Sequence, residues 1–166
     1  MGAIAAKDLA EWFDAYGAQL VLYARQWVSA PAAEDLVQEV FIRLTCQPAA
    51  PMNAKAWLLT SVRHAALDAM KTARRRQSRD RLAGEARAHL FAASSASAGL
   101  DVAEVQAALA TIPMIQREVI TLRIWAEATF EEIAGIVGLP LSTVYQHYRS
   151  GLETIRSRWE SPCRKT

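Results

Sequence analysis

The chain has 166 residues, of which 52% are hydrophobic and 22% are charged, and its net charge at neutral pH is +2. This hydrophobic content is enough for a buried core and excludes a wholly disordered chain. No stretch approaches the roughly 18 apolar residues of a membrane-spanning helix, and the N-terminus lacks the apolar core of a signal peptide. We therefore expect a cytoplasmic protein that does not insert into membranes.

Apolar residues recur every three or four positions in the first half, which predicts helices and no substantial sheet. The first helix is expected over 8–28, with an aromatic stripe assigned to the core: Leu9, Trp12, Phe13, Tyr16, Leu20 and Tyr23. Pro31 should break the chain before a second helix over 33–45. Asn53 is a candidate cap for a third helix that runs into an arginine cluster, and 82–91 is expected to form a fourth, weak helix.

Between the two halves lies an alanine, serine and glycine tract at 92–99 that has nothing to bury. We place a flexible linker over 82–100, which separates a first domain at 1–81 from a second at 101–166. The expected fold class is therefore all-α, with two small helical bundles joined by a flexible linker.

The second domain contains a helix-turn-helix pattern. Pro113 suits the first turn of the helix that precedes it. Thr129 and Glu132 have the spacing of a capping box, in which each side chain accepts a hydrogen bond from the other residue's backbone N–H. Gly138 can end this short helix, and Pro140 prevents its simple continuation.

A second helix follows the turn, and Ser142 or Thr143 is expected to cap it. Its predicted buried stripe consists of Val144, Tyr148, Leu152 and Ile155. The opposite face carries polar groups that suit base edges and phosphates. The pattern alone also fits a tight pair of packed helices that never contacts DNA.

Charge is polarised along the chain. Residues 63–81 hold seven basic and two acidic side chains, whereas 8–41 hold six acidic side chains and Arg25 as the one basic residue. The basic segment suits phosphate binding. Cys46 and Cys163 stand apart, so free thiols are expected rather than a disulfide or metal site.

Three blocks together resemble the extracytoplasmic-function group of bacterial RNA polymerase sigma factors, whose members keep only regions two and four. Residues 33–44 resemble the polymerase-binding helix of region two, and 56–71 with the following arginines resemble the helix that reads the −10 element. Residues 112–156 resemble region four, which reads the −35 element. The three blocks occur in the family's order and cover most of the chain.

The resemblance implies three sets of functional residues. Those for binding the core polymerase are Asp35, Gln38 and Glu39. Those for the −10 element are Trp57, Arg63, His64, Lys71, Arg74 and Arg75. Those for the −35 element are Ser142, Thr143, Tyr145, Gln146, His147, Arg149 and Arg156.

The chain departs from the family pattern at two places. His64 stands where the family usually has an Asn that contacts an extruded base, and Tyr145 stands near where the family has small or basic residues. Promoter preference is therefore open. Asp68 is expected to pair with Arg63 or Lys71 rather than to face DNA.

We expect a sigma factor that binds core RNA polymerase and promoter DNA, is monomeric when free, and is restrained by an anti-sigma factor. No cofactor, metal or catalytic residue is expected. The alternative is a helix-turn-helix regulator that binds DNA without polymerase and uses its N-terminal bundle for another interaction. A small helical hydrolase using Glu34, Asp35 and a histidine is disfavoured, because no spacing in the sequence suggests a polar pocket.

Overall fold

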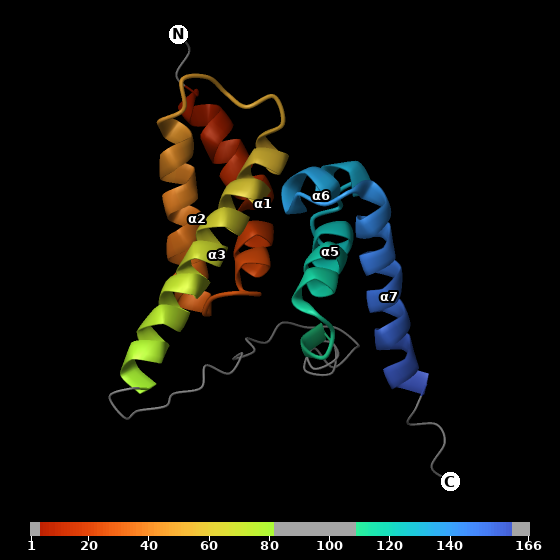
Figure 1. Ribbon diagram of the computed structural model, residues 1–166. Helices are drawn as coiled ribbons and strands as arrows, with labels where there is room; N and C mark the ends of the chain where they lie inside the picture. The colour runs from red at the N-terminus through yellow and green to blue at the C-terminus, as the bar shows by residue number, and fades with distance from the viewer. Residues whose placement is uncertain (1–3, 82–108, 161–166) are drawn as a thin grey trace. The chain divides into compact units, whose positions relative to one another are not determined.

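The computed structural model describes residues 4–81 and 109–160, without the side chains of 79–81 and 158–160. These residues form six helices and no strand, which confirms the all-α prediction (Figure 1). The chain divides into two compact units, which are considered one at a time below. The predicted linker over 82–100 and the predicted weak helix at 82–91 fall outside the described residues.

The first unit is a bundle of three helices, α1 (Ala6–Ala24), α2 (Ala30–Thr45) and α3 (Ala54–Arg81) (Figure 1). Each helix contributes an apolar stripe that packs against the other two. The buried side chains include Leu20, Tyr23, Leu36, Val40, Leu44, Leu58, Val62 and Ala66. The first half of α3 is therefore held by the bundle.

Three details of this unit differ from the sequence prediction. Helix α1 ends at Ala24, and turns replace the predicted last helical residues. Phe13 is 48% exposed rather than part of the core, and its ring meets Phe41 edge-on with centroids 5.1 Å apart. Pro31 does not break the chain but lies in the first turn of α2, where its missing N–H leaves no hydrogen bond unmade.

Asn53 caps α3 as predicted, because its side-chain oxygen accepts a hydrogen bond from the backbone N–H of Ala56 at 2.9 Å. The helix then continues through the arginine cluster to Arg81 without a break. Residues 71–78 are all exposed. The cations of this segment are therefore presented on a helix that extends beyond the part of α3 packed in the bundle.

The second unit contains α5 (Met114–Ile124), α6 (Phe130–Val137) and α7 (Leu141–Glu160) (Figure 1). Pro113 is the N-cap residue directly before α5 and not part of its first turn, where it was predicted. The capping box of α6 is confirmed: Thr129 N–H donates to the Glu132 carboxylate at 2.9 Å, and Glu132 N–H donates to the Thr129 hydroxyl at 3.2 Å. Gly138 ends α6 at φ 72°, a conformation that favours glycine.

The start and the buried face of α7 differ in part from the prediction. The helix begins at Leu141, so Ser142 and Thr143 lie inside its first turn and are not its caps. Val144 and Ile155 are buried as expected, but Leu152 is 36% exposed. Gly151 is buried instead. Because glycine has no Cβ, α7 can approach Ile120 of α5 closely at this position.

Candidate nucleic-acid interface

The acidic face of α2 is exposed as its sequence suggested. Asp35, Gln38 and Glu39 all lie on the solvent side of the helix, and in the part of the chain that the structure describes neither carboxylate forms an ion pair. Ile42 lies seven residues after Asp35, on the same face, and is 64% exposed. Exposed large apolar side chains beside polar groups mark surfaces that bind other proteins.

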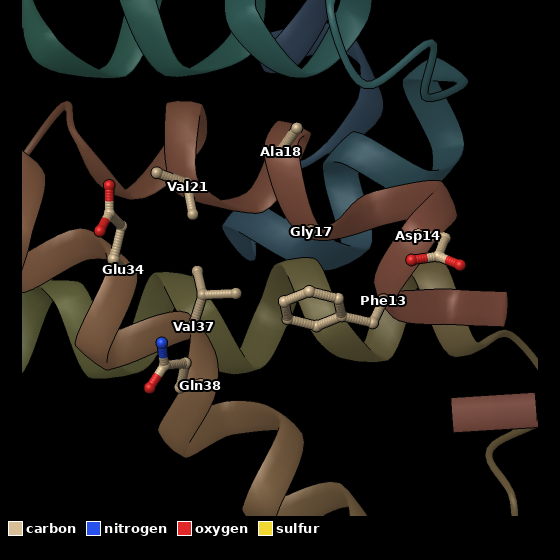
Figure 2. Close-up of a pocket in the computed structure, with 8 residues that line it drawn as sticks. All are labelled: Phe13, Asp14, Gly17, Ala18, Val21, Glu34, Val37 and Gln38. Carbon is tan, nitrogen blue, oxygen red and sulfur yellow. The ribbon is translucent and has the colours of Figure 1, made fainter. Parts of the chain in front are cut away.

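Sequence reasoning missed Ile42, although its helical spacing from Asp35 places it on the same face. It also missed the exposure of Phe13, which lines an open pocket of about 340 Å³ between α1 and α2. Figure 2 shows Phe13 and Val37 in this pocket, with the carboxylates of Asp14 and Glu34 toward its opposite ends. The acidic face is therefore continuous with a partly apolar depression.

Helix periodicity sorts the −10 candidates into two lines along α3. Trp57, His64, Lys71 and Arg75 follow at spacings of seven, seven and four residues, so they share one face. Arg63 and Arg74 are eleven residues apart and share an adjacent line. His64, Lys71, Arg74 and Arg75 are exposed, whereas Trp57 and Arg63 are half-buried.

The first of these lines also contains one acid. Lys71 Nζ lies 3.6 Å from a carboxylate oxygen of Asp68, with both side chains more than 60% exposed, which confirms one of the two expected local pairs. An exposed pair of this kind is weak and is screened by salt. Lys71 therefore remains accessible to a phosphate.

The exposed side of α7 collects most of the −35 candidates. Ser142, Tyr145, Gln146, Arg149 and Arg156 are exposed, and Thr143 and His147 are half-buried. Arg149 lies 3.4 Å from Glu153, one turn further along the same face. The side of α7 away from α5 thus combines amide, hydroxyl, phenol and guanidinium groups.

An aromatic cluster joins the start of α6 to α7. The Phe130 ring meets the rings of Tyr145 and Tyr148 edge-on, at centroid distances of 5.5 and 5.3 Å. The Arg123 guanidinium lies 5.0 Å from the Phe130 centroid, and its Nη1 donates a hydrogen bond to the Ala128 carbonyl at 2.9 Å. Phe130 and Arg123 were not predicted, because the geometry of the turn decides which side chains meet across it.

Elsewhere in the second unit, burial removes water from the Arg117 guanidinium and lowers its pKa. Among the described residues, no three His, Cys, Asp or Glu side chains gather closely enough to hold a metal ion. No helix in the same residues is long and apolar enough to span a bilayer.

Comparisons with known families match each of the two units separately. The family model for sigma-70 region 2 matches residues 12–76, which include the exposed faces of α2 and α3. The model for sigma-70 region 4 matches residues 108–157, which include α5, α6 and most of α7. No curated protein sequence matches the chain significantly.

Two solved structures show the same fold. The sigma factor RpoE from Bartonella quintana, solved with the anti-sigma factor NepR, superposes with a TM-score of 0.80 at 23% sequence identity, covering 93% of this chain and 98% of that chain. CnrH, solved with the cytosolic domain of CnrY, superposes with a TM-score of 0.65 at 18% identity, covering 95% of this chain and 90% of that chain.

Proposed function

Because the chain belongs to the sigma-70 family and is a sigma factor that directs RNA polymerase to promoters, we propose that three surfaces divide this work. The acidic face of α2 binds the core enzyme, the cationic lines of α3 hold the −10 element, and α7 reads the −35 element. The observation that carries this assignment is the sign of each exposed surface: unpaired carboxylates on α2 and cations on α3.

The polymerase contact combines charge with apolar burial. Asp35 and Glu39 attract a basic surface of the polymerase, and Gln38 supplies hydrogen bonds between them. Ile42 supplies the apolar centre that such interfaces usually bury. Carboxylates at the rim speed association and select the partner, whereas burial of Ile42 slows dissociation.

The two lines on α3 suit single-stranded DNA. Lys71, Arg75 and Arg74 neutralise phosphates of the opened strand, and His64 stacks on or hydrogen-bonds an unpaired base. Trp57 lies in line with His64 and can extend the stacking surface. We assign Asp68 to local pairing with Lys71 rather than to DNA contact.

On α7, Arg149 and Arg156 anchor duplex phosphates while Ser142, Tyr145 and Gln146 reach base edges. Thr143 and His147 flank this face and support it from its half-buried side. The family acts without catalysing a reaction of its own, and we assign none to this chain. Because its partner polymerase works in the cytoplasm, we place this protein there too.

An anti-sigma protein is a further proposed partner. Both solved relatives are complexes, RpoE with the anti-sigma factor NepR and CnrH with the cytosolic domain of CnrY. A restraining protein that covers the acidic face of α2 would block polymerase binding directly. We propose that any such regulator competes with the core enzyme for Asp35, Glu39 and Ile42.

The test uses gel filtration to measure whether the purified full chain co-elutes with bacterial core polymerase. The double variant Asp35→Lys and Glu39→Lys should lose co-elution with the polymerase, because it turns two attractive charges into repulsive ones. Glu11→Lys, which reverses an exposed carboxylate on α1, is the matched control and should retain binding. Equal binding by all three proteins would refute the assignment of the acidic face of α2, whereas no binding by any of them would favour a DNA-binding regulator that acts without polymerase.

A further inference from the structure

The exposed side of α7 is more apolar than phosphate binding requires. Leu141 is 45% exposed, Tyr145 49% and Leu152 36%, and their spacings of four and seven residues place them on one face. Leu141 and Tyr145 lie in the first two turns, the part of a second helix-turn-helix helix that enters the major groove. The reading end of α7 therefore presents an aliphatic and an aromatic side chain beside Ser142 and Gln146.

The first two turns of α7, residues 141–147, contain no arginine or lysine. Among the described side chains of α7, the arginines are Arg149 and Arg156, and both lie further along the helix. Arg149 also forms an ion pair with Glu153, with its Nη2 3.4 Å from a carboxylate oxygen. Base recognition at the start of the helix must therefore come from hydrogen bonds and apolar contact.

The Tyr145 ring is held in place before any DNA binds. Its edge contact with Phe130 fixes one side, and Phe130 is itself held by Tyr148 and by the Arg123 guanidinium. Arg123 is anchored in turn by its hydrogen bond to the Ala128 carbonyl. A ring that is already oriented loses less conformational entropy on binding than a free side chain does.

We propose that Tyr145, together with Leu141, recognises the C5 methyl group of thymine in the −35 element, and that Phe130 is a positioning residue for Tyr145. This inference rests on the proposed function. Thymine alone among the four bases presents a methyl group in the major groove, and apolar side chains are its usual partners. The chain thus selects thymine at one or more −35 positions by apolar contact.

The test replaces thymine by deoxyuridine in the −35 element of a promoter selected from a library with the full chain and core polymerase. Deoxyuridine lacks the methyl group and keeps every hydrogen-bonding atom. Burying a group of this size contributes about 0.8 kcal/mol, so each methyl lost at a contacted position should weaken promoter binding about fourfold. Substitutions outside the element should have no effect.

Variants of the chain separate methyl recognition from general binding. Tyr145→Ala should lose most of the difference between thymine and deoxyuridine promoters, and Tyr145→Phe should keep the fourfold difference because the ring remains. Phe130→Leu should reduce the difference and Phe130→Tyr should retain it. Arg149→Ala is the matched control: it should weaken binding to both promoters alike and preserve their ratio.

Three results would overturn the proposal. The first is no deoxyuridine effect in the unaltered chain, and the second is an undiminished effect in Tyr145→Ala. The third is that Tyr145→Ala weakens co-elution with core polymerase, which would assign the apolar face to a protein partner. Each of these results leaves promoter-directed transcription by the unaltered chain intact, whereas the absence of any such transcription would refute the proposed function itself.

Discussion

Replacing Gly151 by alanine tests the packing that orients α7. A Cβ at this position would lie 2.7 Å from Ile120 Cδ1 and 3.3 Å from Gln116 Cβ, both on α5. Because Ile120 is only 2% exposed, it has little room to move aside. Overpacking of this kind costs about 1–3 kcal/mol, whereas alanine gains about 1 kcal/mol over glycine in a helix. We expect a net destabilisation of about 1 kcal/mol.

The double variant with Ile120→Val provides the decisive comparison. Valine lacks the atom that meets the new Cβ, and on its own this change costs about 0.5–1.5 kcal/mol. If the contact is as described, the double variant should be about 1 kcal/mol more stable than the sum of the single changes predicts.

Native-state hydrogen exchange of α5 and α7 in the full chain measures these differences, with α2 as an internal reference. A loss of about 1 kcal/mol in the free energy of unfolding accelerates hydrogen exchange through unfolding about fivefold. Slower exchange in Gly151→Ala than in the unaltered chain would refute the packing argument. Additive effects of the two changes would refute it as well.

Three further predictions test the capping, charge and surface assignments. Thr129→Ala removes the hydroxyl of the α6 capping box and should destabilise the second unit by about 1 kcal/mol, seen as faster exchange in α6; unchanged exchange would contradict the capping role. Arg75→Ala should lower the slope of log affinity against log salt for opened promoter DNA by about 0.7, because one phosphate contact is lost. Arg76 lies off the line of His64 and Lys71, so Arg76→Ala should leave the slope unchanged. Equal slopes for the two variants would contradict the assignment. Asp68→Asn breaks an exposed ion pair, so the free energy of unfolding, measured by thermal unfolding, should change by less than about 0.5 kcal/mol. A larger loss would show that the pair is structural.

Local signals in the sequence predicted the helices well. The Asn53 cap and the Thr129–Glu132 capping box depend on residues three apart, so their chemistry can be recognised without knowing the fold. Burial along α2 followed from the spacing of its apolar residues for the same reason.

Errors arose where packing between helices decides the outcome. Phe13 continues the aromatic stripe and meets Phe41 of α2 edge-on, but it lines an open pocket between α1 and α2, so half of it stays exposed. Leu152 was predicted to be buried, but Gly151 is buried against α5 instead, because α5 and α7 lie too close at this position for a larger side chain. The aromatic contact between Phe130 and Tyr145 depends on the turn at Gly138, whose geometry no spacing rule specifies.

The functional surfaces were predicted as sets of residues, and their arrangement came from the structure. Helix α3 was expected to carry cations, but the single unbroken helix is what aligns His64, Lys71 and Arg75 with Trp57. The roles of these residues stay predictions, because exposure and alignment permit DNA contact without requiring it.

In vitro transcription with purified core polymerase across a promoter library tests the central claim most directly. With the chain added, transcripts should start downstream of sequences that share both a −10 and a −35 element, and removing either element should abolish them. If core polymerase produces the same transcripts with and without the chain, in the absence of any inhibitor, the account of this protein as a promoter-selecting subunit is wrong.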